Sequence, residues 1–124
     1  MKLIIGGAYQ GKLDFAKNAY QIADDDIFIC SNQTVDFSKK CIASLEEFTY
    51  ACVKENSDPV AYFQSHKEEW KDSILICEDI FCGVVPLGAD LRAWRQCTGL
   101  LCQYLSREAQ SVSRIFCGLE QKLK

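Results

Sequence analysis

Long apolar runs and blocks of like charge are missing from this 124-residue chain, and no export signal is expected. No segment approaches the ~20 consecutive apolar residues of a transmembrane helix, and the apolar part of Met1–Gly6 is too short for a signal peptide. The formal net charge is −3 and the pI is near 5.1, so neither a nucleic acid nor a membrane surface is an expected partner. We therefore expect a cytoplasmic protein whose ligands are small molecules.

Metal-site spacing is missing too, although the chain has eight cysteines. No CxxC pair occurs, and the sole histidine is not paired with a cysteine. Because export is not expected, we interpret the thiols as reduced and as small hydrophobic side chains. Three are expected in strands and two on a helix face, namely Cys30, Cys77 and Cys117, and Cys41 and Cys52.

Proline is rare, and no linker, repeat or low-complexity segment divides the chain, so one domain over residues 1–124 is expected. Four short apolar runs predict buried strands: Leu3–Ile5, Ile27–Cys30, Ile74–Cys77 and Val112–Cys117. Helical patterns alternate with these runs, which is typical of a parallel α/β sheet. The predicted fold class is a small, P-loop NTPase-like, three-layer α/β sandwich with a mostly parallel sheet.

Two connections carry the longer helical patterns. In the first, Asp36 or Ser38 is expected to cap a helix, and Ser57-Asp58-Pro59 to open another. The apolar positions of the capped helix are Cys41, Leu45, Phe48 and Cys52. The second connection predicts one long helix, with a stripe formed by Leu91, Trp94, Thr98, Leu101 and Leu105 and continued by Ala109.

The most informative motif is the loop that follows the first predicted strand. Its residues are Gly6, Gly7, Ala8, Tyr9, Gln10, Gly11, Lys12 and Leu13, which match the phosphate-binding pattern GxxxxGK[ST] except at the last position. In such a loop the backbone N–H groups surround phosphate, and the lysine reaches the β and γ oxygens. A strand before the loop and a helix after it supply the required context. The sequence therefore predicts nucleotide binding at Gly6–Leu13.

Leu13 replaces the serine or threonine whose hydroxyl normally holds Mg²⁺, so weaker metal binding at this loop is expected. Asp14 adds a carboxylate to the first turn of the helix, where it competes with phosphate for the positive end of the helix dipole. An alternative is that Asp14 supplies an oxygen to Mg²⁺.

A second motif ends the third predicted strand with two carboxylates, Glu78 and Asp79, and continues into a turn with Gly83 and Pro86. Ligands bind at the carboxyl ends of strands in open α/β sheets, and carboxylates there hold Mg²⁺ next to nucleotide phosphates. The two residues are therefore candidate metal ligands, and Asp79 is a candidate catalytic residue beside Lys12. The alternative is a pair of solvated loop charges.

Together these segments resemble the adenosylcobinamide kinase and adenosylcobinamide-phosphate guanylyltransferase family of cobalamin biosynthesis. The resemblance covers Met1 to about Tyr20 and Asp72–Lys124. It includes the GGxxxGK loop, the turn Cys82-Gly83-Val84-Val85-Pro86, the Arg92-Ala93-Trp94-Arg95 helix, Gln103-Tyr104-Leu105, and the ending Ile115-Phe116-Cys117-Gly118-Leu119-Glu120-Gln121-Lys122-Leu123-Lys124.

The resemblance implies a transferase that uses Mg²⁺ with GTP or ATP to move phosphate or GMP onto the aminopropanol arm of cobinamide. It also implies a corrinoid ligand and a homo-oligomer. Gly83, Pro86, Arg92 and Arg95 become candidate substrate-binding residues, although a solvated helix face explains the two arginines equally well. A small kinase for another alcohol is a further hypothesis, resting on fold analogy alone.

The middle of the chain departs from the family pattern. Family members carry a guanylylated histidine beside an Arg-Pro pair, whereas here the only histidine, His66, lies in Ser65-His66-Lys67-Glu68-Glu69-Trp70 without that pair. His66 is either the guanylyl acceptor or a surface histidine at a helix end. The second interpretation, with Leu13, favours a non-catalytic relative that binds nucleotide or corrinoid through a degenerate loop.

Overall fold

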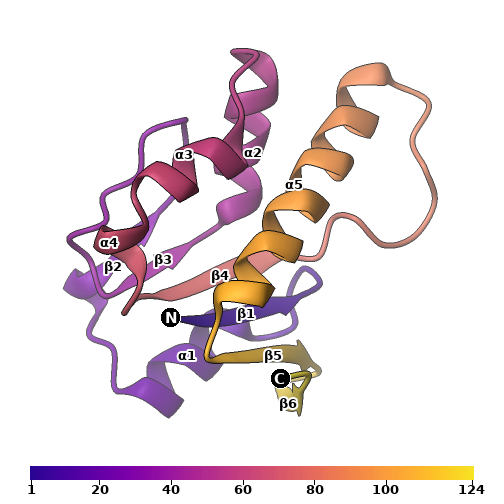
Figure 1. Cartoon of the computed structure of the whole chain (residues 1–124). Coiled ribbons are helices and arrows are strands. Elements are labelled where there is room, and N and C mark those ends of the chain that lie inside the picture. Colours follow the sequence, from indigo (N-terminus) through magenta and orange to yellow (C-terminus); the bar gives the residue numbers. More distant parts are fainter.

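The computed structural model describes residues 1–124 and contains one six-stranded sheet in the order β2-β3-β4-β1-β5-β6 (Figure 1). All neighbouring strands are parallel except β5 and β6, which are antiparallel. The predicted α/β class with a mostly parallel sheet is confirmed. The strands are β1 Lys2–Gly6, β2 Ile27–Ile29, β3 Cys41–Ala43, β4 Ile74–Glu78, β5 Ser111–Phe116 and β6 Leu119–Lys122.

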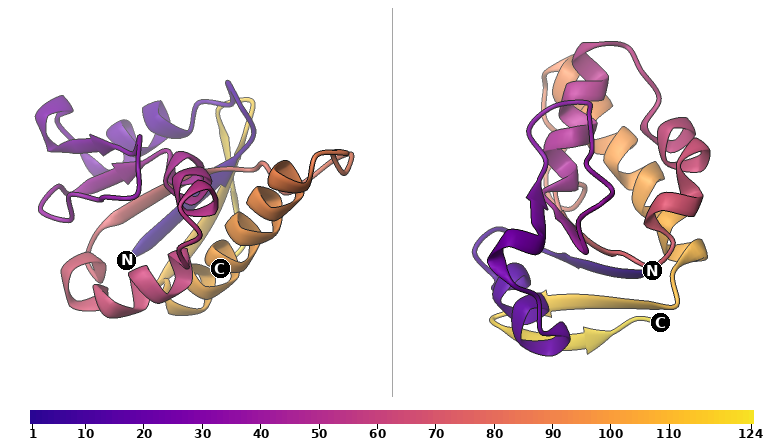
Figure 2. Two further views of the ribbon diagram at one scale, coloured as in Figure 1. Left: turned by 90° about the horizontal axis from the view of Figure 1, so that it is seen from above. Right: turned by 90° about the vertical axis from the view of Figure 1, so that its left-hand side faces the viewer.

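Helices cover both faces of the sheet. Helix α1 lies on one face, and α2 to α5 lie on the other (Figures 1 and 2). The bounds are α1 Lys12–Tyr20, α2 Leu45–Lys54, α3 Pro59–Ser65, α4 Lys67–Trp70 and α5 Ala89–Glu108, with a short 3₁₀ turn at Asp24–Asp26. No helix has the length and apolar content that crossing a bilayer requires.

The central strands alternate between two apolar cores. Leu3 of β1 and Leu75 of β4 are paired in register and pack on the side of α2 to α5. Ile4 and Ile76, the next pair, pack on the side of α1. Because both faces are buried, these strands are apolar at nearly every position rather than at every second one, as the sequence indicated.

The prediction of a helix that includes Cys41 is wrong at its N-terminal end, because Cys41–Ala43 form β3 and α2 begins at Leu45. Ser44 adopts a positive φ of 60°, which separates the strand from α2. The spacing of Cys41 to Leu45 imitates a helical turn, and tertiary pairing with β2 and β4 overrides it. The Asp36 carboxylate bonds the Ser38 N–H at 3.0 Å in its own loop, so it does not cap α2.

Two other helix predictions are confirmed in outline. Asp58 caps α3 by accepting hydrogen bonds from the N–H groups of Val60 and Ala61, with Pro59 at the first helical position. Helix α5 is the predicted long helix, but it ends before Ala109, and its buried stripe begins beyond Leu91, which is exposed. Within this stripe the Thr98 hydroxyl meets that of Thr49 on α2 at 2.6 Å, so the two buried hydroxyls satisfy each other.

The last strand was not predicted. Cys117 and Gly118 both have positive φ, as a two-residue type I′ hairpin turn requires, and they join β5 to β6. Cys117 is therefore exposed in a turn rather than buried in a strand. All eight cysteines are free, and burial raises the pKa of the Cys30 thiol to about 12 and that of Cys41 to about 11.

Candidate functional site

The Gly6–Leu13 loop, here called the glycine loop, leaves the carboxyl end of the central strand β1. At Gly6 a Cβ atom would lie 2.6 Å from the carbonyl oxygen of Ile115 on β5, so only glycine fits there. Tyr9 and Gly11 both have positive φ, 60° and 90°, and Gly11 caps the start of α1. These two left-handed residues turn the chain between the end of β1 and the start of α1.

The Lys12 side chain reaches back across the glycine loop. Its Nζ donates a hydrogen bond to the carbonyl oxygen of Gly7 at 2.7 Å, across the loop. The Lys12 ammonium therefore sits among the backbone groups of the loop, where it adds a positive charge to the N-terminus of α1. A lysine ammonium beside a helix N-terminus is an arrangement that favours an anion.

The β5–β6 turn holds the loop from the other side. The side-chain oxygen Oε1 of Gln10 accepts a hydrogen bond from the Cys117 N–H at 2.6 Å, and its main-chain oxygen accepts one from the Gly118 N–H at 2.9 Å. A type I′ turn leaves these two N–H groups free for partners outside the hairpin. Gln10 thus ties the glycine loop to the last hairpin of the fold, a role that the sequence did not indicate.

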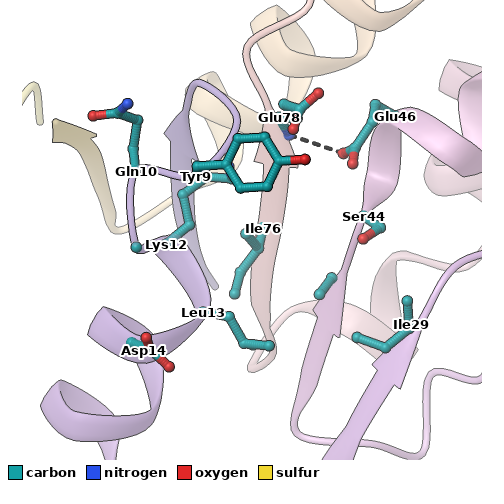
Figure 3. A pocket seen from close by; sticks show the side chains of 12 residues that line it. Tyr9, Gln10, Lys12, Leu13, Asp14, Ile29, Ser44, Glu46, Ile76 and Glu78 are labelled. Carbon is teal, nitrogen blue, oxygen red and sulfur yellow. Dashed lines mark hydrogen bonds between the residues drawn. The ribbon is translucent and has the colours of Figure 1, made fainter. Parts of the chain in front are cut away.

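A cavity of about 270 Å³ opens beside the glycine loop (Figure 3). It lies at the edge of the sheet where β1, β3 and β4 end, as expected for a ligand site in a parallel sheet. One side is polar and the other is aliphatic. The lining residues are Tyr9, Gln10, Gly11, Lys12, Leu13, Asp14, Ile29, Ala43, Ser44, Glu46, Ile76 and Glu78.

Glu46 lines the cavity and is a candidate site residue that the sequence did not indicate. It lies in the first turn of α2, is only 8% exposed, and accepts a hydrogen bond from the Glu78 N–H at 2.8 Å (Figure 3). Its own carbonyl oxygen accepts the indole N–H of Trp94 at 2.7 Å and the Thr49 hydroxyl at 3.0 Å. Burial raises the pKa of the Glu46 carboxyl above its ordinary value, although the Glu78 N–H and nearby Lys12 oppose that shift.

The two carboxylates predicted as a pair are separated by the alternation of the strand. Glu78 lines the cavity at the end of β4, whereas Asp79 does not. The Asp79 N–H bonds the Gly6 carbonyl oxygen at 2.8 Å, which continues the pairing of β4 with β1, so consecutive side chains point to opposite faces. One carboxylate oxygen of Asp79 is buried without a hydrogen-bond partner.

The turn with Gly83 and Pro86 belongs to a separate part of the surface. Residues 80–88, here called the arginine-bound loop, stand away from the sheet and lead into α5 (Figure 1). Arg95 donates to the carbonyl oxygens of Phe81 at 3.2 Å, Gly83 at 3.1 Å and Val84, and Arg92 donates to those of Pro86 at 3.5 Å and Leu87. Both guanidinium groups therefore bind the loop backbone.

His66 is not brought to the glycine loop. It lies between α3 and α4, and α4 leads into the amino end of β4. The histidine is therefore at the amino ends of the strands, whereas the cavity is at their carboxyl ends. Its Nδ1 lies 2.7 Å from the Tyr62 carbonyl oxygen, and its ring stacks on Phe37 with the ring centres 5.4 Å apart. These contacts match the interpretation of a histidine at a helix end.

Glu46, Glu78 and Asp14 are the carboxylates that line the cavity with Lys12, Asp14 from the first turn of α1. No group of three or more His, Cys, Asp or Glu residues in the chain could hold a metal ion by itself. In nucleotide sites, however, Mg²⁺ is bound by one or two carboxylates together with phosphate oxygens and water. The donor set therefore fits Mg²⁺ that arrives with a phosphate ligand. No protein-family model matches the chain, and no curated protein matches it.

Proposed function

We propose that the chain is a P-loop NTPase-like phosphotransferase that binds GTP or ATP at the glycine loop and phosphorylates an alcohol. The observation that carries the proposal is the Lys12 ammonium, enclosed by the loop and sharing a cavity with the carboxylates of Glu46 and Glu78. The resemblance of Met1–Tyr20 and Asp72–Lys124 to adenosylcobinamide kinases supplies the acceptor, the aminopropanol arm of cobinamide.

The proposed reaction is an in-line displacement. The acceptor oxygen bonds to the γ-phosphorus while the bond from that phosphorus to the bridging oxygen of the β-phosphate breaks, and the nucleoside diphosphate leaves. Glu46 takes the proton of the attacking hydroxyl, a role that suits a buried carboxylate with a raised pKa. Lys12 and the N–H groups of the loop stabilise the charge on the transferred phosphoryl group.

Glu78 would hold Mg²⁺, which neutralises phosphate charge when it is bound. Asp79, the other metal and catalytic candidate, does not share this cavity, so we give it no step in the reaction. Guanylyl transfer through His66 is not part of the proposal either, because the histidine lies at the amino ends of the strands, away from the cavity.

A second candidate function is nucleotide or corrinoid binding without chemistry. The observation that favours it is Leu13, which places an aliphatic side chain where a hydroxyl would otherwise help to hold Mg²⁺. A nucleotide-binding relative would share the binding step with the phosphotransferase and differ from it only in turnover.

Isothermal titration with Mg·GTP and Mg·ATP tests the binding step. We expect Lys12→Ala to weaken nucleotide binding by about tenfold or more, because a charged contact to phosphate is worth about 1.5–3 kcal/mol. Lys54→Ala, at the exposed far end of α2, is the matched control and should bind as the wild type does. Absence of nucleotide binding by the wild-type protein would refute the phosphotransferase and any nucleotide-binding role, and a titration with cobinamide tests corrinoid binding. Phosphorylation of cobinamide separates the phosphotransferase from a binding protein.

A further inference from the structure

Leu13 lies in an aliphatic wall of the cavity. Figure 3 shows Leu13 and Ile29 pointing toward each other from opposite sides, with Ile76 on the strand between them. Ala43 of β3 completes the wall. Ile76 and Ala43 are buried, but Ile29 remains 52% exposed at the mouth of the cavity. Aliphatic carbon therefore faces the space that lies beside Lys12.

Phosphate alone cannot account for this wall. Charged oxygens lose hydration against aliphatic side chains without gaining hydrogen bonds there. The polar side of the cavity, with Lys12, Glu46 and Glu78, is where a phosphoryl group is stabilised. The aliphatic side suits a ligand that also carries alkyl carbon close to its reacting oxygen.

The nucleoside part of a nucleotide can lie in a second groove, outside this cavity. On the hairpin side of the glycine loop this groove is lined by Gly11, Asp14, Phe15, Asn18, Ala19 and Gly118. From Lys12 to Asn18 helix α1 rises roughly 9 Å, at about 1.5 Å per residue. This distance matches the reach of a ribose and a base beyond an α-phosphate. Asp14 and Asn18 expose polar groups along it for the ribose hydroxyls and the base edge.

We propose that Leu13, with Ile29, Ala43 and Ile76, binds the alkyl part of the acceptor alcohol, while the nucleoside lies in the groove beside Asn18. The inference rests on the proposed phosphotransferase function and assigns its two substrates to the two sides of the glycine loop. The acceptor is thus an alcohol whose hydroxyl-bearing carbon carries alkyl groups, and it is held with its oxygen toward Glu46. Leu13 is a specificity-determining residue in this arrangement.

The test compares three ligands on two variants of Leu13 by isothermal titration. Cobinamide is titrated into protein saturated with a non-hydrolysable GTP analogue and Mg²⁺, and the analogue and inorganic tripolyphosphate are titrated separately. We expect Leu13→Ser to weaken cobinamide binding by about tenfold, the effect of losing a small aliphatic contact, and to leave the affinity for tripolyphosphate unchanged. Leu13→Met keeps the aliphatic contact and should retain cobinamide affinity.

Two further variants make the assignment independent of any single substitution. Ile29→Ser changes the half-exposed residue of the aliphatic wall that faces Leu13, and it should weaken cobinamide binding in the same way. Asn18→Ala should weaken the GTP analogue by about tenfold through the loss of a polar contact, without affecting tripolyphosphate or cobinamide. Gln121→Ala, an exposed amide outside both cavities, is its control and should leave all three affinities unchanged.

The outcomes separate this inference from the proposed function. If Leu13→Ser leaves cobinamide affinity unchanged but strengthens Mg²⁺-dependent nucleotide binding, Leu13 is a lost metal ligand and the inference is overturned. If the wild-type protein binds nucleotide but not cobinamide, the inference fails while nucleotide binding stands. If the wild-type protein binds neither, the proposed function itself fails.

Discussion

The closest backbone approach in the site is at Gly6, and Gly6→Ala tests whether it constrains the fold. The added Cβ would lie 2.6 Å from the Ile115 carbonyl oxygen, whereas at Gly7 it would lie 3.7 Å from the Gln10 side chain, an ordinary contact. The oxygen at Gly6 belongs to the backbone of β5. Relief therefore requires the paired strands β1 and β5 to separate, rather than a side chain to rotate.

The magnitude follows from two opposing terms. Overpacking of this kind costs about 1–3 kcal/mol, and replacing glycine by alanine returns about 0.4–1 kcal/mol by restricting the unfolded chain. The expected net loss for Gly6→Ala is about 1–2 kcal/mol, and Gly7→Ala should be neutral or stabilising by up to ~1 kcal/mol. For a chain of this length, that loss lowers the Tm by roughly 3–10 °C.

Urea unfolding of the two variants, followed by circular dichroism, measures the difference directly. Nucleotide titration of the folded Gly6→Ala protein should also show weaker binding, because the start of the glycine loop moves with β1. If Gly6→Ala were as stable as Gly7→Ala and bound nucleotide equally well, the tight approach of β1 to β5 would not be what requires glycine at position 6.

Three further predictions concern the Glu46 carboxyl, the cap of α3 and the arginine-bound loop. Because burial raises the pKa of the Glu46 carboxyl, its ionisation destabilises the fold as the pH rises through the raised pKa, so Glu46→Gln should be more stabilising in urea unfolding at pH 7 than at pH 4. A pH-independent difference, or the same trend in the exposed control Glu47→Gln, would contradict this reasoning. Asp58→Ala removes the cap of α3 and should cost about 1 kcal/mol by the same assay, and a variant as stable as wild type would show the cap to be unimportant. Arg95→Ala frees carbonyls of the arginine-bound loop, so limited proteolysis should cut that loop several times faster than in Arg107→Ala; equal rates would refute the role of Arg95.

The parts of the fold that the sequence predicts are those encoded locally. The glycine loop could be identified because Gly6, Gly11 and Lys12 stand at fixed spacing between a strand and a helix. Strand β3 could not be identified, because three residues carry too little pattern and their stability comes from pairing with β2 and β4. Strand β6 is polar and exposed, so only its hairpin turn defines it.

The candidate site was only half predictable for a related reason. Lys12 comes shortly after β1 and Glu78 ends β4, two strands with clear apolar patterns. Glu46 reaches the cavity from the first turn of α2, which follows β3, the strand that the sequence did not indicate. The roles of Arg92 and Arg95 depend on where residues 80–88 fold back, which no local pattern specifies. The separation of Glu78 from Asp79 follows from strand alternation once β4 is known to extend to Glu78.

The bond between Gln10 and Cys117 has a consequence for the order of folding. It joins positions 107 residues apart, so the loop that follows β1 is completed by the hairpin of β5 and β6. Contacts of such long sequence separation form late, because the loop they close carries a large entropic cost. During synthesis Gly6–Lys12 emerge from the ribosome early but gain this support only after β5 and β6 have been made. Competence for ligand binding should therefore appear as a final step of folding rather than with the strand that carries the loop.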